Sequence, residues 1–163
     1  MNEQAFQTAD LCDAHSGSVR VAHSILKSFG GRTRFYGPIA TLQVLEDNVI
    51  VKQRLTTRGN GRVLVVDGGG ALNCALVGDI LAGLAVDNGW AGIVINGCIR
   101  DSVAVSRMSV GVFALGTSPR RCERGGSGLS DIPVSFAGVA FTPGEYLYAD
   151  EDGLMVCAEA LLL

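Results

Sequence analysis

The chain has 163 residues and a mass of 17.0 kDa, and its 48% hydrophobic and 18% charged residues are typical of one globular domain, expected over residues 1–163. Glycine is in excess, with 22 residues where about 7% is usual, but it follows no short period, which excludes collagen-like and low-complexity chains. The net charge of −3 argues against direct binding of nucleic acid, although eleven Arg against two Lys favour a small anionic partner.

The first predicted elements are short. A helix is expected over Thr8–His15, with Thr8 as its cap. The β-branched and aromatic stretch Arg34–Leu45 predicts a strand. The segment Asn48–Thr57 fits either a short helix or a second strand.

A βαβ unit is predicted next. The apolar run Arg62–Asp67 is typical of a strand buried on both faces, and Ala91–Asn96 is a second such strand. Between them Ala71–Ala85 predicts a helix that ends at Asn88-Gly89. Its apolar face contains Leu76, Ile80, Leu81, Leu84 and Ala85. Strand, helix and strand should form a right-handed parallel crossover.

The second half is predicted to be rich in strands. Short strands are expected over Gly111–Gly116, Ile132–Phe136, Val139–Phe141, Tyr146–Ala149 and Leu154–Cys157. The fold class is therefore α/β, a single domain with a βαβ core and a mixed sheet.

The five cysteines are odd in number and form no CxxC pair. We expect Cys12, Cys74, Cys98, Cys122 and Cys157 to be buried free thiols in a reducing cytoplasm. No apolar run reaches the roughly 18 residues of a membrane span, and the polar first residues do not resemble a signal peptide.

A first candidate site is the glycine loop Asp67–Gly70 after the first buried strand. Backbone N–H groups of such a loop can approach an anion. The loop lacks the third glycine of a dinucleotide fingerprint and the lysine of a phosphate loop. A plain turn between strand and helix is the alternative.

A second candidate is Gly78-Asp79-Ile80-Leu81. Glycine inside a helix costs up to about 1 kcal/mol relative to alanine, which suggests that the helix begins at this glycine. The N–H groups of residues 79–81 would then face a bound carboxylate. The alternative is a longer helix that tolerates Gly78 for close packing.

The third candidate, Arg100-Asp101, follows the second buried strand, where open α/β sheets place their ligands. Adjacent in sequence, the two side chains should pair poorly with each other. An Arg for a carboxylate and an Asp for a metal would suit a keto acid. The alternative is that both stabilise loops.

Four weaker features have ordinary structural explanations. Cys98 lacks a nearby histidine to activate it, and His15 and His23 lack metal-ligand spacing. Asp150–Gly153 resembles the start of a calcium loop but fits a hairpin turn better. The basic residues Arg120, Arg121 and Arg124 fit a solvated loop or a subunit contact.

Residues 63–101, VLVVDGGGALNCALVGDILAGLAVDNGWAGIVINGCIRD, resemble the regulator of ribonuclease activity A (RraA) family, which includes the class II 4-hydroxy-4-methyl-2-oxoglutarate (HMG) aldolases. The most specific element is a glycine followed about twenty residues later by Arg-Asp, here Gly78 and Arg100-Asp101. The resemblance extends from Thr8 to Gly153.

The resemblance implies a swivelling β/β/α domain, a ring-shaped homotrimer and active sites between subunits. It implies that the amides of Gly78, Asp79, Ile80 and Leu81 hold the substrate carboxylate, that Arg100 binds the keto acid and that Asp101 ligates Mg²⁺ or Mn²⁺. Asp79 and Asp101 would help to move protons through a water. The implied reactions are retro-aldol cleavage to pyruvate and decarboxylation of oxaloacetate, through a metal-stabilised pyruvate enolate.

Two departures accompany the resemblance. Ala104 stands where the family often has Lys or Arg, and Glu159 is the only late acid where the efficient aldolases use an acidic C-terminal extension. The alternative function that the resemblance implies is a non-catalytic regulator that binds and inhibits ribonuclease E. A methyltransferase is the third, suggested by the glycine loop.

Overall fold

The computed structural model describes residues 5–123 and 125–161. Its helices are α1 (Thr8–Ala14), α2 (Val49–Leu55), α3 (Asp79–Asp87) and α4 (Ser102–Val105). Its strands are β1 (Val19–Val21), β2 (Lys27–Ser28), β3 (Phe35–Gln43), β4 (Val63–Asp67), β5 (Ala75–Val77), β6 (Gly92–Ile99), β7 (Gly111–Thr117), β8 (Leu129–Ser130), β9 (Val134–Phe136), β10 (Val139–Phe141), β11 (Tyr146–Asp150) and β12 (Gly153–Cys157).

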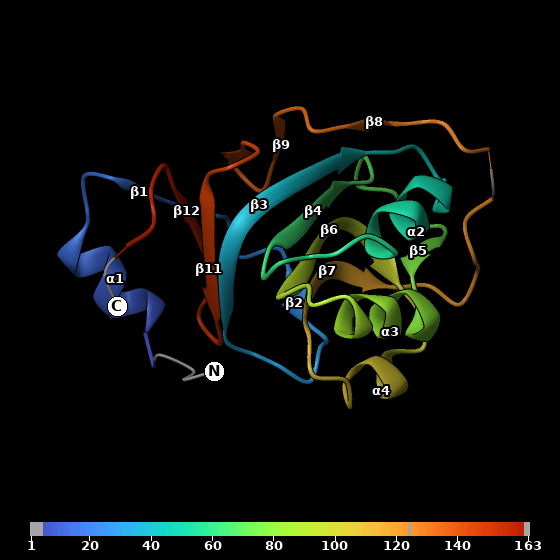
Figure 1. Ribbon diagram of the computed structural model, residues 1–163, viewed down its shortest axis with the longest axis horizontal. Helices are drawn as coiled ribbons and strands as arrows, with labels where there is room; N and C mark the ends of the chain where they lie inside the picture. The colour runs from blue at the N-terminus through green and yellow to red at the C-terminus, as the bar shows by residue number, and fades with distance from the viewer. Residues whose placement is uncertain (1–4, 124, 162–163) are drawn as a thin grey trace.

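One large mixed sheet organises the molecule, with strand order β1-β12-β11-β3-β4-β6-β7-β2. Strands β3, β4, β6 and β7 are parallel to one another, whereas β11, β12 and β1 are antiparallel. The long curved strand β3 joins the two parts, because Phe35–Pro38 pair with β11 and Ile39–Gln43 pair with β4 (Figure 1). The predicted βαβ crossover is present as β4, α3 and β6.

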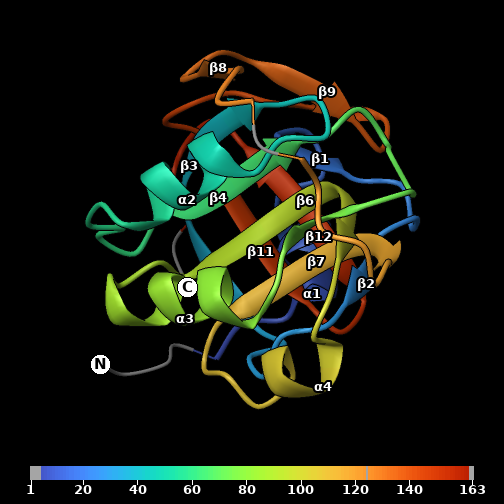
Figure 2. The ribbon, with the colours of Figure 1, turned by 90° about the vertical axis from the view of Figure 1, so that its right-hand side faces the viewer.

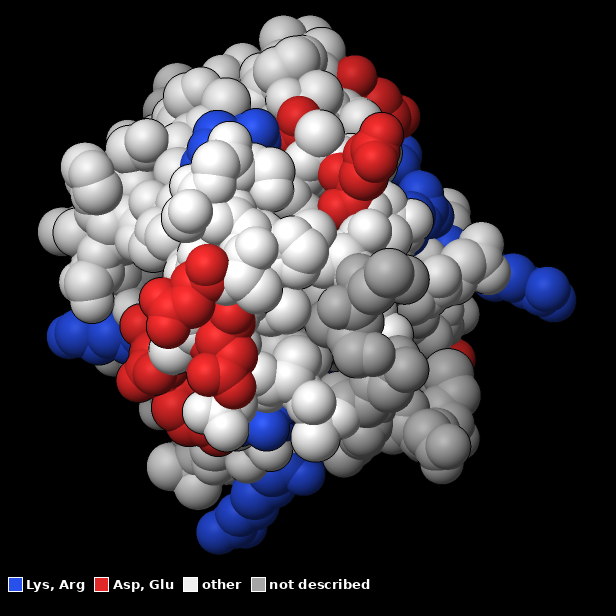
Figure 3. All heavy atoms as spheres, turned by 90° about the vertical axis from the view of Figure 1, so that its left-hand side faces the viewer, with Lys and Arg blue, Asp and Glu red and all other residues white. Residues whose placement is uncertain are grey.

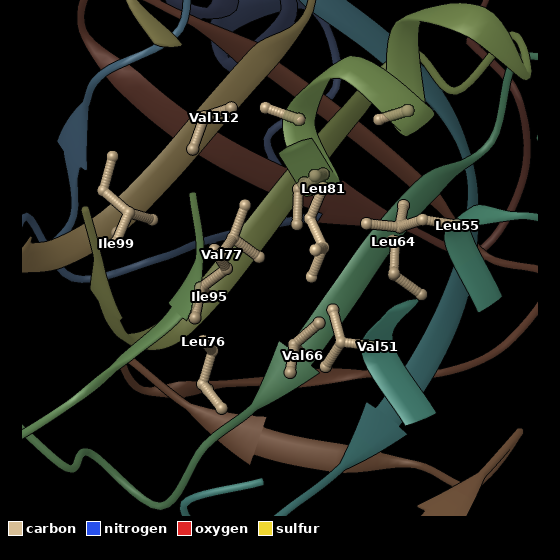
Figure 4. Packing of buried hydrophobic residues seen from close by; sticks show 14 of the residues in the cluster. Val51, Leu55, Leu64, Val66, Leu76, Val77, Leu81, Ile95, Ile99 and Val112 are labelled. Atoms are coloured by element: carbon tan, nitrogen blue, oxygen red, sulfur yellow. The ribbon is translucent and has the colours of Figure 1, made fainter. Parts of the chain in front are cut away.

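The helices α2, α3 and α4 lie on one face of the parallel strands (Figure 2). Leu55 of α2 and Leu81 of α3 pack there with Leu64, Ile95 and other buried aliphatic side chains of the strands (Figure 4). These strand residues read as continuous apolar runs because helices cover this face and a second layer covers the other.

The opposite face of the parallel strands packs on the antiparallel strands, through residues such as Phe35, Val65, Val94 and Leu147. This gives the expected order of two β layers and one helical layer. Phe35 fits there because Gly92 and Gly111 leave room for its ring; a Cβ on Gly111 would lie 2.1 Å from Phe35 Cδ1.

Helix α1 docks on the antiparallel strands. The N–H and the hydroxyl of Thr8 donate to the buried carboxylate of Asp150, at 2.6 and 2.7 Å. The prediction that Thr8 caps α1 is therefore wrong, because the N-cap is Gln7. The Thr8 side chain binds Asp150 of β11 instead. Tyr148 contacts both ends of the described chain: the Phe6 ring lies 5.5 Å away, and the Leu161 N–H donates to its hydroxyl at 2.8 Å.

Most predicted elements are confirmed, with shifts of a few residues at their ends. The undecided segment 48–57 contains helix α2. The sequence predicted no strands at β1, β2, β5 and β8 and no helix at α4; each has two to four residues and is held by its neighbours rather than by its own pattern.

Charge is unevenly distributed on the face that contains α1. Acidic side chains gather there in patches, and basic side chains stand apart from one another (Figure 3). This face therefore offers no continuous basic surface among its described residues of the kind that follows a phosphate backbone. Within residues 5–123 and 125–161, no helix is long and apolar enough to cross a membrane.

Candidate functional site

The strand-end site comprises residues 78–81 and 100–101, where β5 and β6 end. Helix α3 begins at Asp79 with Gly78 as its N-cap, in extended conformation. The predicted helix over Ala71–Ala85 is therefore wrong in its first turns, and the interpretation that the helix begins at Gly78 is right. Residues Ala75–Val77 form β5 instead, because they pair with β6 and are fully buried.

Gly78 allows the close approach of the two halves of the site. A Cβ at this position would lie 2.7 Å from Asp101 Oδ2 and 3.3 Å from Arg100 Cγ. Any side chain would therefore push Arg100 and Asp101 away from the start of α3. The backbone supports the same arrangement, because the Arg100 N–H donates to the Val77 carbonyl at 2.9 Å.

Asp101 adopts a left-handed conformation, with φ of 55°, and caps the short helix α4. This turn directs its carboxylate back toward α3, where Oδ2 accepts the Asp79 N–H at 3.3 Å. The same oxygen lies 3.8 Å from Arg100 Nε. The two side chains thus form only a long, partly exposed ion pair, as expected for adjacent residues, and the Asp101 carboxylate has its own partner in the Asp79 N–H.

The start of α3 presents backbone donors to carboxylates. The Asp101 carboxylate accepts the Asp79 N–H, and the Asp79 carboxylate accepts the Ile80 N–H at 2.8 Å. A helix N-terminus attracts anions through such N–H groups and the helix dipole. Carboxylate oxygens of the protein therefore stand where an anionic ligand would bind, next to a guanidinium.

The borders of the site are apolar and open to solvent. Ile80 and Val103 are 69% and 66% exposed, whereas Leu81 is buried in the core below α3 (Figure 4). Val103 was not predicted from the sequence, because it lies between Ser102 and Ala104 in a short stretch that carries no signal of a binding site.

The residues of the site fit a hard divalent cation. In proteins, Mg²⁺ is usually bound by one or two carboxylates, several waters and the substrate. The Asp101 side chain is 42% exposed, and Asp79 supplies a second carboxylate in the first turn of α3. Within the described residues, no cluster of three or more His, Cys, Asp or Glu forms an all-protein metal cage.

The other predicted candidates do not join this site. In the glycine loop, Asp67 Oδ1 accepts the Gly69 N–H and the Asn96 side-chain amide, at 3.0 and 2.9 Å. The loop is thus stabilised by its own hydrogen bonds, beside an open pocket of about 340 Å³ that Leu45 and Leu129 also line. This geometry favours the turn over a nucleotide loop.

The cysteines differ from the prediction. Cys74 and Cys122 form a disulfide, so the expectation of five free thiols is wrong for this pair. The fold brings the two residues together although they are 48 positions apart. Cys98 is a buried free thiol, and burial raises its pKa, which argues against a nucleophilic role.

The remaining candidates have structural roles. Asp150–Gly153 connects β11 and β12 as a hairpin, as predicted. Neither His15 nor His23 belongs to a group of three or more potential metal ligands among the described residues. Arg120 and Arg121 lie beside the edge of β5, and Arg124 lies outside the described residues.

Comparisons with known proteins identify relatives along nearly the whole chain. The family model described as “RraA-like: Aldolase/RraA” matches residues 8–156. A protein of Aromatoleum aromaticum named “Putative 4-hydroxy-4-methyl-2-oxoglutarate aldolase” is 54% identical over 157 residues, which are 96% of this chain and 99% of that protein.

Two solved structures share the fold with a TM-score of 0.93. One, from Geobacillus kaustophilus HTA426, is named as an S-adenosylmethionine:2-dimethylmenaquinone methyltransferase; it is 46% identical, over 96% of this chain and 97% of that one. The other is named “RNA-processing inhibitor RraA from Thermus thermophilis”; it is 41% identical, over 98% of this chain and 96% of that one. The relatives thus have three different named activities.

Proposed function

This chain belongs to the RraA-like family, and from that premise we propose that it is a divalent-metal-dependent lyase acting on pyruvoyl-type keto acids. The reactions proposed are cleavage of 4-hydroxy-4-methyl-2-oxoglutarate to pyruvate and decarboxylation of oxaloacetate. The observation that carries the proposal is the meeting of Arg100, Asp101 and the N-terminus of α3 around Gly78.

The chain's own residues divide the work of binding. The N–H groups at residues 78–81 would hold the substrate carboxylate at the positive end of the helix dipole. The Arg100 guanidinium would bind the keto acid with charge-assisted hydrogen bonds, and it would stabilise negative charge as that charge develops on the keto oxygen. When the substrate carboxylate accepts the Asp79 N–H, it would replace the Asp101 carboxylate in that hydrogen bond.

Asp101, with Asp79 beside it, would hold the Mg²⁺ or Mn²⁺ ion. A divalent cation supplies positive charge that polarises a carbonyl without protonating it. The Asp79 carboxylate, in the first turn of α3, would orient a water that carries the proton between solvent and the reacting carbon.

A ring-shaped homotrimer with shared sites is part of the proposal. Ile80 and Val103 are large apolar side chains that are more than half exposed beside the polar residues of the site. A neighbouring subunit that covers them would exclude water from the keto acid, which strengthens the electrostatic interactions there. Light scattering of the purified protein should give about 51 kDa, three times the chain mass of 17.0 kDa.

The test of catalysis is pyruvate release from oxaloacetate and from 4-hydroxy-4-methyl-2-oxoglutarate, with Mg²⁺, with Mn²⁺ and with chelator. Metal alone provides the uncatalysed rate. We expect Arg100→Ala and Asp101→Asn to lower kcat/KM roughly 10²–10³-fold, the usual loss for one group that stabilises transition-state charge.

Arg107→Ala and Asp87→Asn are matched controls, because both side chains are exposed and lie outside the strand-end site. They should keep wild-type rates. Turnover that survives chelation, or that is the same in Arg100→Ala as in wild type, would contradict the lyase.

A regulator that binds ribonuclease E is the second candidate, and the Thermus relative named as an RNA-processing inhibitor favours it. A pull-down with ribonuclease E, followed by an RNA-cleavage assay, tests it. The name of the Geobacillus relative raises a methyltransferase as a third candidate. The internal hydrogen bonds of the glycine loop make it the weakest, and calorimetry with adenosylmethionine should show no binding.

A further inference from the structure

The disulfide between Cys74 and Cys122 lies at the start of β5, the strand that leads into Gly78. Cys74 directly precedes β5, and Cys122 lies in the segment that follows β7. The two Cα atoms are 4.8 Å apart. The cross-link therefore joins the approach to the strand-end site to a loop that is distant in sequence.

Strand β5 is short, and its pairings on both sides are short or irregular. It contains three residues, and on one side it pairs with β6 in a register that shifts between Ala75 and Val77. On its other side the Ala75 N–H donates to the Arg120 carbonyl at 2.7 Å, and the Cys122 N–H donates to the Ala75 carbonyl at 3.2 Å. The disulfide links Cys74 and Cys122 directly beside this second pairing.

The position of Gly78 depends on β5. Val77 is the last residue of the strand, and its carbonyl accepts the Arg100 N–H. A shift of β5 would move Gly78 relative to Asp101. The two residues are so close that a Cβ on Gly78 would lie 2.7 Å from Asp101 Oδ2. The geometry of the site thus requires β5 to be fixed.

We propose that the Cys74–Cys122 pair is a redox latch for the strand-end site: the disulfide fixes β5 and Gly78, and reduction to two thiols loosens them. The reductant is a dithiol. Its thiolate attacks one sulfur, its second thiol resolves the mixed disulfide, and the products are two cysteine thiols and one oxidised dithiol.

A second anchor lies close to the disulfide in the sequence. Cys74 and Cys122 are only 4% and 2% exposed, so a dithiol reaches them only after a local opening of the fold. The buried Asp47 carboxylate accepts the N–H groups of Gly125 and Ser127 at 2.9 and 3.0 Å, shortly after Cys122 in the chain. Asp47→Asn should therefore speed reduction several-fold at the same dithiol concentration.

The test compares the oxidised and the reduced forms of the wild-type protein. Its main result therefore does not require that a cysteine variant folds correctly. Titration of thiols in denaturant should give three in the oxidised protein (Cys12, Cys98 and Cys157) and five after dithiothreitol. Amide hydrogen exchange followed by mass spectrometry should then be about tenfold faster for residues 75–81 in the reduced protein. Exchange in β11 and β12 should not change.

The Cys74→Ala/Cys122→Ala variant should match the reduced protein and ignore the dithiol, whereas Cys12→Ser should respond as wild type does. Five thiols in protein treated with oxidant, equal exchange at residues 75–81 in both states, or an equal acceleration along the whole chain would each overturn the latch.

A kinetic arm rests on the proposed function. If the lyase assignment holds, KM for oxaloacetate should rise on reduction and recover on reoxidation, and an unchanged KM would count against the latch. Absence of turnover in both states would refute the lyase alone, because the exchange measurement reports on β5 independently of activity.

Discussion

The N–H of Asp79 lies 3.3 Å from Oδ2 of Asp101, so the residue that follows β6 contacts the first turn of α3. The two residues are 22 positions apart and follow β5 and β6, neighbouring parallel strands that end at the same edge of the sheet. The contact is possible because Gly78 between them has no side chain.

Gly78→Ala should therefore impair function more than stability. The new Cβ would lie 2.7 Å from Asp101 Oδ2 and would displace Arg100 and Asp101. We expect kcat/KM for the keto acid to fall roughly 10²-fold, as for a misplacement of about 1 Å. Steady-state kinetics and a urea melt measure the two effects.

Gly83→Ala is the matched control in the same helix, where a Cβ would have no atom within 4 Å. It should keep full activity and stabilise the protein by up to about 1 kcal/mol, because alanine is the better helix former. Equal activities of the two variants would remove the steric argument for Gly78.

Asp47→Asn should destabilise the fold. The carboxylate is buried, and it accepts the N–H groups of Val49, Gly125 and Ser127. The amide leaves at least one of these donors without an acceptor, at a cost of roughly 1–3 kcal/mol. Asp131→Asn, which removes an exposed ion pair with Arg54, should cost less than about 1 kcal/mol.

The stabilising effect of Asp47 should disappear in acid. Burial raises the pKa of this carboxyl, but the N–H groups of Val49, Ser127 and Gly125 outweigh burial and leave the pKa below its ordinary value. A group with a lowered folded pKa stabilises fully above its unfolded pKa, near 3.9, and loses this effect as the pH falls through the folded value.

The difference in unfolding free energy between wild type and Asp47→Asn should therefore be constant above about pH 5 and shrink below about pH 4. Urea melts across this range measure it. A difference that stays constant down to the lowest accessible pH would show that the charge of Asp47 is not what stabilises the loop.

Gly111→Ala should disrupt the core between the two β layers. Its Cβ would lie 2.1 Å from Phe35 Cδ1, and the ring has little room to move because it also faces Gly92. Overpacking of this kind costs about 1–3 kcal/mol or more. Gly116→Ala in the same strand, with no atom within 4 Å of a new Cβ, should change stability by less than about 0.5 kcal/mol.

A double variant separates overpacking from loss of strand geometry. Phe35→Leu removes part of the ring and should restore part of the stability lost in Gly111→Ala, because contacting residues do not act additively. If the two costs simply add in chemical denaturation, the contact with Phe35 is not the cause.

The βαβ core and the location of the site could be predicted from the sequence because both follow from strong local patterns. The apolar runs around Val65 and Val94 are typical of strands buried on both faces, and the carboxyl ends of parallel strands meet at one edge. Gly78 and Arg100-Asp101 meet at that edge for the same reason.

The features that the sequence did not reveal depend on tertiary contacts. Leu76 fits a helical face with Ile80, Leu81 and Leu84, but pairing with β6 makes it part of a strand. The approach of Cys74 to Cys122 follows from the pairing of Ala75 with the segment after β7, and no spacing in the chain indicates it. The left-handed turn at Asp101 likewise depends on its surroundings.

Tyr148 connects the first and last described parts of the chain, through the Phe6 ring and the Leu161 N–H. In Figure 1, α1 and strands β1 and β12 accordingly lie on the same side of the molecule. A peptide that joined the first and last described parts would let the polypeptide be reopened elsewhere, for example at the exposed turn around Asn60. A chain reopened at that turn would keep β3 paired with β11 and β4, so we expect the fold to tolerate circular permutation there.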